Sequence, residues 1–198
     1  MEIWLEAVIR QLILYSLPLL ISLTFVSFIE SKLTHQETAH PFFAISWMGT
    51  WLPLLAAILF SRAVIFSLPQ PVASGSRAAL YRCLGHIILC STGFLLYSWS
   101  LNHQPSTGLP PLHLWWGKVL MFFNLCMACL HLVPLPGMLM GELILPRQWL
   151  SILTQNNSRH TITLFTLLAA SPLTDWLLGS PVIFPIYEQL ANLAETLI

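Results

Sequence analysis

The sequence predicts an all-α fold in which a bundle of about five helices crosses a membrane. Hydrophobic residues make up 56% of the chain and charged residues only 8%, whereas a soluble domain carries about 25% charged residues. Several apolar runs also reach the roughly 20 residues that a spanning helix needs. Polar, proline-rich stretches separate these runs. The length of 198 residues suits one membrane-embedded domain, residues 1–198.

Five apolar segments define the expected spans: 7–29, 44–67, 79–101, 113–133 and 160–178. Residues 185–198 have apolar positions three to four apart, which is the spacing of an amphipathic helix. This last helix is too short and too charged to span, so we expect it to lie at the membrane interface. Glu2 and Glu6 replace the basic start of a signal peptide, so the first segment is expected to be a retained span.

Charge argues against a nucleic-acid partner and gives an expected orientation. The chain has 8 Lys+Arg and 8 Asp+Glu, with a net charge of zero, so nothing attracts a polyanion. With alternating spans, the N-terminus and the 68–78 and 145–159 segments share one side, which the excess of arginine predicts to be cytoplasmic. That side collects Arg10, Arg62, Arg77, Arg82, Arg147 and Arg159, and the other has Lys32 and Lys118.

Ionisable residues at membrane depth are candidates for function, because burying them in hydrocarbon is costly. They are Glu30, Lys118, His86, His131, Glu142 and Asp175. Each also has a structural interpretation. Glu30 follows the first span and can face water, Lys118 can reach the interface, and each histidine can bind a neighbouring carbonyl.

The most unusual string follows the fourth span. There His131 is followed by Pro134, Pro136 and Gly137. Two prolines and a glycine break a helix and leave carbonyl groups without their usual donors. Such backbone is tolerated at membrane depth only inside protein or beside a polar cavity. We therefore expect an unwound segment packed within the bundle.

This string resembles the N-L-x-P-x-P-x-L-D-G region of the site-2 protease family, the intramembrane zinc metalloproteases. His131 stands at the asparagine position, Gly137 replaces a proline, and Leu139 falls where the family has its zinc-binding aspartate. The segment from His40-Pro41 to Gly49-Thr50 is similar to the N-P-x-x-H-I-D-P-x-G-T segment of the compact bacterial branch. This resemblance implies a bacterial inner-membrane protein, and the arginine distribution places its N-terminus in the cytoplasm.

The chain departs from the family at the metal ligands. Counting back from His40, the H-E-x-x-H motif falls on Val26–Glu30, so both histidines and the general base are absent. Catalytic zinc needs about three protein ligands, and neither Val26 nor Leu139 can bind it. We therefore expect no metal and no cofactor. His35 and His40 form H-x-E-x-x-H, whose outer positions do not share a helix face.

The resemblance without its ligands implies a catalytically inactive, site-2-protease-like membrane protein. Its former substrate cleft would hold another membrane protein subunit or a client helix within the lipid bilayer. Small residues for close helix contact include Ser91, Gly93 and Ala128. The expected motif and cleft residues are His131, Pro134, Pro136, Gly137, Glu30, His40, Pro41, Gly49 and Glu142.

Two alternatives stay open at this point. The first is an active intramembrane metalloprotease with a rewired metal site, built from some of Glu30, His35, His40, His86, His131 and Glu142. The second is a small transporter or channel subunit that uses Asp175 and Lys118. The absence of an internal sequence repeat disfavours the second alternative.

Overall fold

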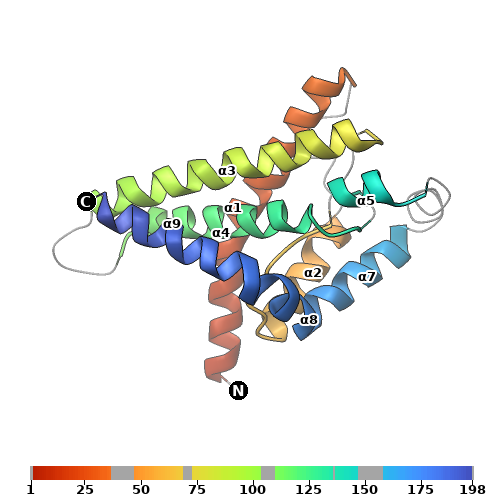
Figure 1. The fold of residues 1–198 in the computed structure, drawn as a ribbon. Helices are drawn as coiled ribbons and strands as arrows, with labels where there is room; N and C mark the ends of the chain where they lie inside the picture. Colours follow the sequence, from red (N-terminus) through yellow and green to blue (C-terminus); the bar gives the residue numbers. More distant parts are fainter. Residues whose placement is uncertain are drawn as a thin grey trace.

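The computed structural model describes residues 2–36, 47–68, 73–103, 110–135, 137–146 and 158–197. Within these ranges every regular element is a helix, as Figure 1 shows. The main helices are α1 (Glu2–Thr34), α2 (Trp47–Leu59), α3 (Ser76–Asn102), α4 (Leu112–Leu130), α5 (Leu139–Ile144), α7 (Ser158–Ala170) and α9 (Phe184–Thr196). The all-α prediction is confirmed for this part of the chain.

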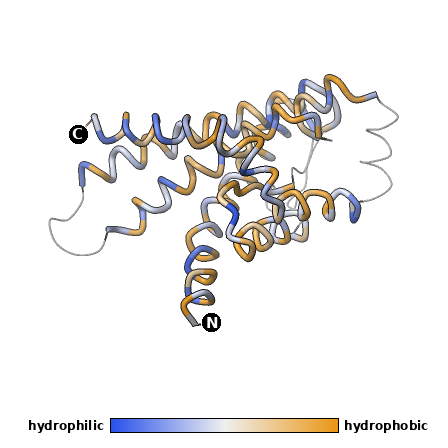
Figure 2. The backbone as a smooth tube through the Cα atoms, turned by 60° about the horizontal axis from the view of Figure 1, so that its bottom comes forward, coloured by the Kyte–Doolittle hydropathy of each residue, from blue (hydrophilic) through white to orange (hydrophobic). Residues whose placement is uncertain are grey.

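Three helices, α1, α3 and α4, are long and apolar enough to cross a membrane. A fourth candidate is the pair formed by α7 and residues 172–196, which bends by 67° at its break. Large apolar side chains also face outward. Ile13 is 59% exposed and Leu95 is 65% exposed, and Figure 2 shows hydrophobic residues continuing along α1 to the N-terminus. The described residues thus contain three or four candidate spans, not five.

The expected span at 44–67 is wrong in its helical extent. α2 has 13 residues, which at about 1.5 Å per residue is shorter than a hydrocarbon core of about 30 Å. The helix ends before Ser61, whose φ is 51°. Val64 and Phe66 then follow in non-helical backbone and are fully buried. These apolar residues raise the hydropathy of the segment, but they pack against protein and not against lipid.

The expected span at 160–178 is also interrupted. α7 ends at Ala170, and the hydroxyl of Ser171 accepts a 3.1 Å hydrogen bond from Leu173 N at the start of the short helix α8 (Pro172–Thr174). A π-helical segment, η2 (Asp175–Ile183), leads into α9. This last helix matches the amphipathic helix expected at 185–198. It packs on α3 and α4, where Phe122 and Tyr187 meet edge to face with ring centres 5.0 Å apart.

Helices α3 and α4 approach closely because each presents a glycine to the other. A β-carbon on Gly93 would lie 2.5 Å from the backbone nitrogen of Met121. A β-carbon on Gly117 would lie 2.9 Å from the nitrogen of Tyr97. Real β-carbons do not approach backbone this closely, so the spacing of the two helices requires glycine at both positions.

Helix α1 runs across the layer formed by α3, α4 and α9 (Figure 1). If α2 does not cross the membrane, then α1, α3 and α4 are successive spans. The start of α1 and the start of α4 then face the same side. Arg10 and Lys118 were expected on opposite sides, but each has its charged group 5.9 Å from the centre of the Trp115 ring. The alternation of five spans is therefore not supported.

Candidate functional site

A buried ion pair joins the end of α1 to the start of α3. Arg82 Nη1 donates to Glu30 Oε1, and the two side chains are 2% and 0% exposed. Glu30 Oε1 also accepts a 2.9 Å hydrogen bond from Ala73 N. Arg82 Nη2 donates to the carbonyl of Gly137 at 2.9 Å. The interpretation in which Glu30 faces water is thus wrong, because its carboxylate is buried and accepts hydrogen bonds from Arg82 and from Ala73 N inside the bundle.

The ion pair connects four parts of the chain that are distant in sequence. Burial of two charges is costly unless further hydrogen bonds satisfy their remaining polar atoms. Here the segment before α3 supplies both a donor and an acceptor, since Ala73 O also accepts from Arg82 Nη1 at 3.3 Å. The broken segment after α4 supplies the Gly137 carbonyl. Arg82 therefore takes up one of the carbonyl groups that the break leaves without a helical donor.

A second polar network lies in the same core. Asn124 Nδ2 donates to Ser22 Oγ and to Leu120 O, each at 2.8 Å. Asn124 Oδ1 lies 2.8 Å from His86 Nδ1. Because the amide nitrogen is used as a donor, the amide oxygen must accept, and His86 carries its hydrogen on Nδ1. Helices α1, α3 and α4 are therefore joined through one fully buried asparagine.

His131 organises the chain reversal that follows α4. Its Nδ1 accepts a 3.2 Å hydrogen bond from Leu139 N, and its carbonyl accepts a 3.0 Å bond from Met140 N. The ring is fully buried, and its centre lies 6.0 Å from that of His86. Since Nδ1 accepts, a neutral His131 carries its hydrogen on Nε2. Among the described residues, Nε2 has no hydrogen-bond partner.

Two glycines allow the broken segment to fold back onto the end of α4. Gly137 has a φ of 78°, in the left-handed region that favours glycine. A β-carbon on Gly141 would lie 1.9 Å from the carbonyl oxygen of Leu135, so α5 can pack here only with glycine. The expected unwound segment is confirmed over the residues that the structure describes, although Pro134 is exposed rather than buried.

The three positions that correspond to the zinc ligands of the resembled family come to one region. Val26 is 4% exposed, and its Cγ2 would lie 3.1 Å from a β-carbon on Gly85, one residue before His86. Glu30 pairs with Arg82 one turn earlier on α3. Leu139 takes part in this region through its backbone N–H, which donates a hydrogen bond to His131 Nδ1.

The other predicted site residues are placed in different ways. Glu142 joins the region from α5, where its Oε2 accepts a 3.2 Å bond from Gly75 N. Gly49 lies apart on α2, and its carbonyl accepts from Leu68 N at 3.0 Å. His35 is exposed at the end of α1. His40, Pro41 and Pro136 lie outside the described residues.

These residues do not fit a catalytic zinc ion. A metal site needs deprotonated donor groups that converge on one point, but Val26 and Leu139 have apolar side chains. The carboxylate of Glu30 is neutralised by the guanidinium of Arg82, and a fixed cation repels a second one. Within the described ranges, no three His, Cys, Asp or Glu side chains gather as metal ligands would.

The residues proposed for transport also have structural partners. Asp175 Oδ1 accepts from Val64 N at 2.8 Å, which fixes the segment after α2 to the start of η2. Lys118 lies 4.8 Å from the ring centre of Tyr97. Both charged groups thus have local roles in packing.

Sequence reasoning missed Arg82, Asn124 and Ser22 as members of the site. Arg82 counts among the loop cations in the orientation rule, yet it is buried and paired. A signal for it exists, because an arginine near the start of an apolar helix needs an anion at the same depth. Glu30 is the acidic residue at the end of the preceding span. Asn124 gives a similar signal, as the amide within the apolar run of α4.

Comparisons with known proteins add no family to this geometry. No protein-family model, no curated protein and no solved structure matches the chain.

Proposed function

We propose that this chain is a non-catalytic, site-2-protease-like membrane protein that binds a transmembrane helix of another membrane protein. The proposal rests on which residues occupy the region where the family would bind zinc. Val26 and Glu30 approach this region from α1 and Leu139 from α5, and Arg82 of α3 occupies it with its charge neutralised by Glu30. The arrangement favours a structural role, because Val26 and Leu139 carry no ligand atom in their side chains and the carboxylate of Glu30 is paired with Arg82, whereas a metalloprotease needs about three protein ligands.

A surface groove supplies the place for the partner helix. It lies between α3, α4 and α9 and is lined by Ile87, Cys90, Ser91, Phe94, Leu95, Leu125, Ala128 and Leu190. Its lining is almost entirely apolar, so the occupant must be apolar too. Ser91 Oγ donates to Ile87 O at 3.0 Å, which leaves a small side chain with a satisfied hydroxyl at the surface.

Small residues favour a helix over a lipid chain as the occupant. Close approach of two membrane helices depends on small side chains, and van der Waals packing then drives their association. Cys90, Ser91 and Ala128 form such a surface from two adjacent helices. Gly93 does not contribute, because it is used within the contact between α3 and α4. The groove is thus distinct from the polar region, which is closed by its own side chains.

Photocrosslinking in native membranes tests this proposal. A photoreactive side chain at Ser91 is expected to give one dominant adduct, whose peptide is a hydrophobic membrane-spanning segment. Ala128→Trp in the same chain should fill the groove and abolish the adduct. The matched control is Leu167→Trp on α7, where the side chain is 63% exposed and lies outside the groove. This variant should leave the adduct unchanged.

Two outcomes would contradict the proposal. One is an adduct that contains only lipid, because the groove would then face the bilayer. The other is an adduct that Ala128→Trp and Leu167→Trp reduce equally, because the contact would then not depend on the groove. Cleavage of the crosslinked segment by the purified protein would overturn the non-catalytic part of the proposal.

A further inference from the structure

Helix α9 forms one wall of the groove proposed for the partner helix. Its Leu190 lines this groove together with residues of α3 and α4. The groove has a volume of about 310 Å³, at the lower limit of the roughly 300–1,000 Å³ that is usual for small-ligand sites. This space accommodates a few side chains, whereas a whole helix is about 10 Å across. Deeper insertion of a partner helix therefore requires α9 to move away from α3.

Apolar contacts hold α9 lengthwise on α3 and α4 (Figure 1). Near the start of α9, the Tyr187 ring packs against Phe122, which lies near the middle of α4. Near its end, Ala194 is fully buried in a cluster with Tyr97 of α3 and Leu114 of α4. We call this arrangement the docked position of α9.

The outer face of α9 opposes docking because it is polar. Glu188, Asn192 and Glu195 are exposed, and their spacing places them on one face of the helix. Glu188 follows Tyr187 directly, and it forms no ion pair with another residue of the described ranges. With α4 across the membrane, the docked position therefore holds an exposed carboxylate close to the middle of the bilayer, where a charge is costly.

The same helix also suits the membrane interface. An amphipathic helix there turns its apolar face to the acyl chains and its polar face to water. Glu188 would then be hydrated, but Tyr187 and Ala194 would lose their contacts with α3 and α4. Each position thus satisfies one face of α9 at the expense of the other. Two conformations of similar free energy form an equilibrium that a ligand can shift.

The connection between α7 and α9 is anchored at one end and irregular at the other. Asp175 Oδ1 accepts a 2.8 Å hydrogen bond from Val64 N, and Arg62 Nε donates to Ala170 O at 2.9 Å. Both bonds attach the break to the segment after α2. Beyond Asp175, η2 is π-helical and contains Pro181, which has no backbone N–H to donate. This segment is where α9 can change direction, and π-helical turns occur frequently at functional sites.

We propose that α9 is a hinged gate that controls access of the partner helix to the groove. It is closed in the docked position and open when α9 swings about η2 to the membrane interface. This inference rests on the proposed function of the groove. Opening removes the wall at Leu190, so that a helix can approach α3 and α4 directly. The contacts of Tyr187 favour the closed position, and the carboxylate of Glu188 favours the open one.

A photoreactive side chain at Leu190 measures the position of α9 in purified protein in lipid nanodiscs. Internal adducts with α3 or α4 report the closed gate, and lipid adducts report the open one. Glu188→Leu should raise the ratio of internal to lipid adducts by about tenfold, because it removes the charge that docking brings into the bilayer. Tyr187→Ala should lower this ratio, because it removes a docking contact.

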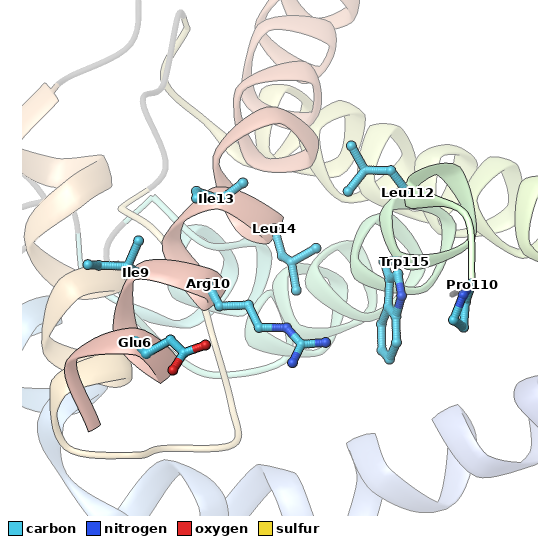
Figure 3. A pocket seen from close by; sticks show the side chains of 8 residues that line it. All are labelled: Glu6, Ile9, Arg10, Ile13, Leu14, Pro110, Leu112 and Trp115. Atoms are coloured by element: carbon cyan, nitrogen blue, oxygen red, sulfur yellow. The ribbon is translucent and has the colours of Figure 1, made fainter. Parts of the chain in front are cut away.

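The matched control, Glu6→Leu, makes the same change of side chain and charge on α1. Glu6 lines a separate groove between the starts of α1 and α4, as Figure 3 shows. This variant should leave the adduct ratio within about twofold of that of the unaltered protein. Equal changes in Glu6→Leu and Glu188→Leu would overturn the proposal, because the ratio would then follow net charge and not the outer face of α9.

Crosslinking from Ser91 in native membranes tests whether the gate controls the groove. Glu188→Leu should lower the yield of the partner adduct, and Tyr187→Ala should raise it. If the adduct ratio at Leu190 responds but the partner adduct does not, α9 moves without controlling access and the gate is wrong. An unchanged ratio in both variants, beside a normal partner adduct, would overturn the gate alone. If the unaltered protein and both variants give no partner adduct, the proposed function fails and the gate fails with it.

Discussion

Replacing Arg82 by leucine is expected to lower the free energy of unfolding by about 3–5 kcal/mol. The change would leave the carboxylate of Glu30 buried without its cation, and would also free the carbonyl of Gly137 that Arg82 Nη2 binds. Equilibrium unfolding in mixed micelles measures the loss. Arg77→Leu, which removes an exposed arginine from the same helix, should change stability by about 0.5 kcal/mol or less.

The double variant Glu30→Leu with Arg82→Leu distinguishes an ion pair from two separate contributions. Removing both charges also removes the free-energy cost of burying them. The double variant should therefore be considerably more stable than Arg82→Leu alone. The two single losses should therefore be strongly non-additive. Additive losses would contradict the pairing of Glu30 with Arg82 on which the site depends.

Replacing Gly93 by leucine is expected to prevent the native packing of α3 on α4. A β-carbon at position 93 would lie 2.5 Å from the backbone nitrogen of Met121. The backbone of α4 can move away from it only if the two helices separate. Overpacking typically costs about 1–3 kcal/mol and sometimes more. We place this change at the upper end, because the clash is with backbone atoms. The readout is the fraction of monodisperse, helical protein recovered after purification.

Thr92→Leu is the matched control for the glycine change. Thr92 is the neighbouring residue on α3, and its side chain is exposed. The same added side chain at this position should leave recovery and stability nearly unchanged. If Gly93→Leu and Thr92→Leu behave alike, the close contact between α3 and α4 described here would be wrong.

Hydropathy predicted the helices whose apolar residues face lipid or a neighbouring helix along their whole length. The expected spans at 79–101 and 113–133 correspond closely to α3 and α4. The first span extends beyond its expected end to Thr34, because Glu30 finds Arg82 inside the bundle and the helix need not end at a charged residue. A hydropathy average over neighbouring residues contains no information about a charged partner elsewhere in the chain.

Hydropathy failed where apolar residues are buried in non-helical backbone. Val64, Ile65 and Phe66 pack into the core while α2 has already ended at Leu59. The same apolar side chains favour transfer from water into lipid and transfer from water into a protein core. Composition therefore does not distinguish a membrane span from a buried non-helical segment. If α2 does not cross the membrane, the chain has one span fewer before α4, and the start of α4 then lies on the same side as Arg10.

The site was predictable in position but not in content. The proline-glycine string correctly indicated a break in the helix next to His131, and the resemblance indicated Val26, Glu30 and Leu139 as positions to compare with the zinc ligands. Arg82 and Asn124 could be found only by asking which buried partners Glu30 and His86 require. That question depends on which helices are neighbours, and sequence spacing alone did not supply the answer.

Metal content of the purified protein tests most directly whether the region around Glu30 and Arg82 is structural and not catalytic. We predict no stoichiometric zinc after purification in zinc-supplemented, chelator-free buffer, and an unchanged trace of metal in His131→Ala and Glu30→Gln. Elemental analysis by mass spectrometry gives the ratio per chain. One zinc ion per chain that is lost in either variant would contradict the account and would support the rewired metalloprotease.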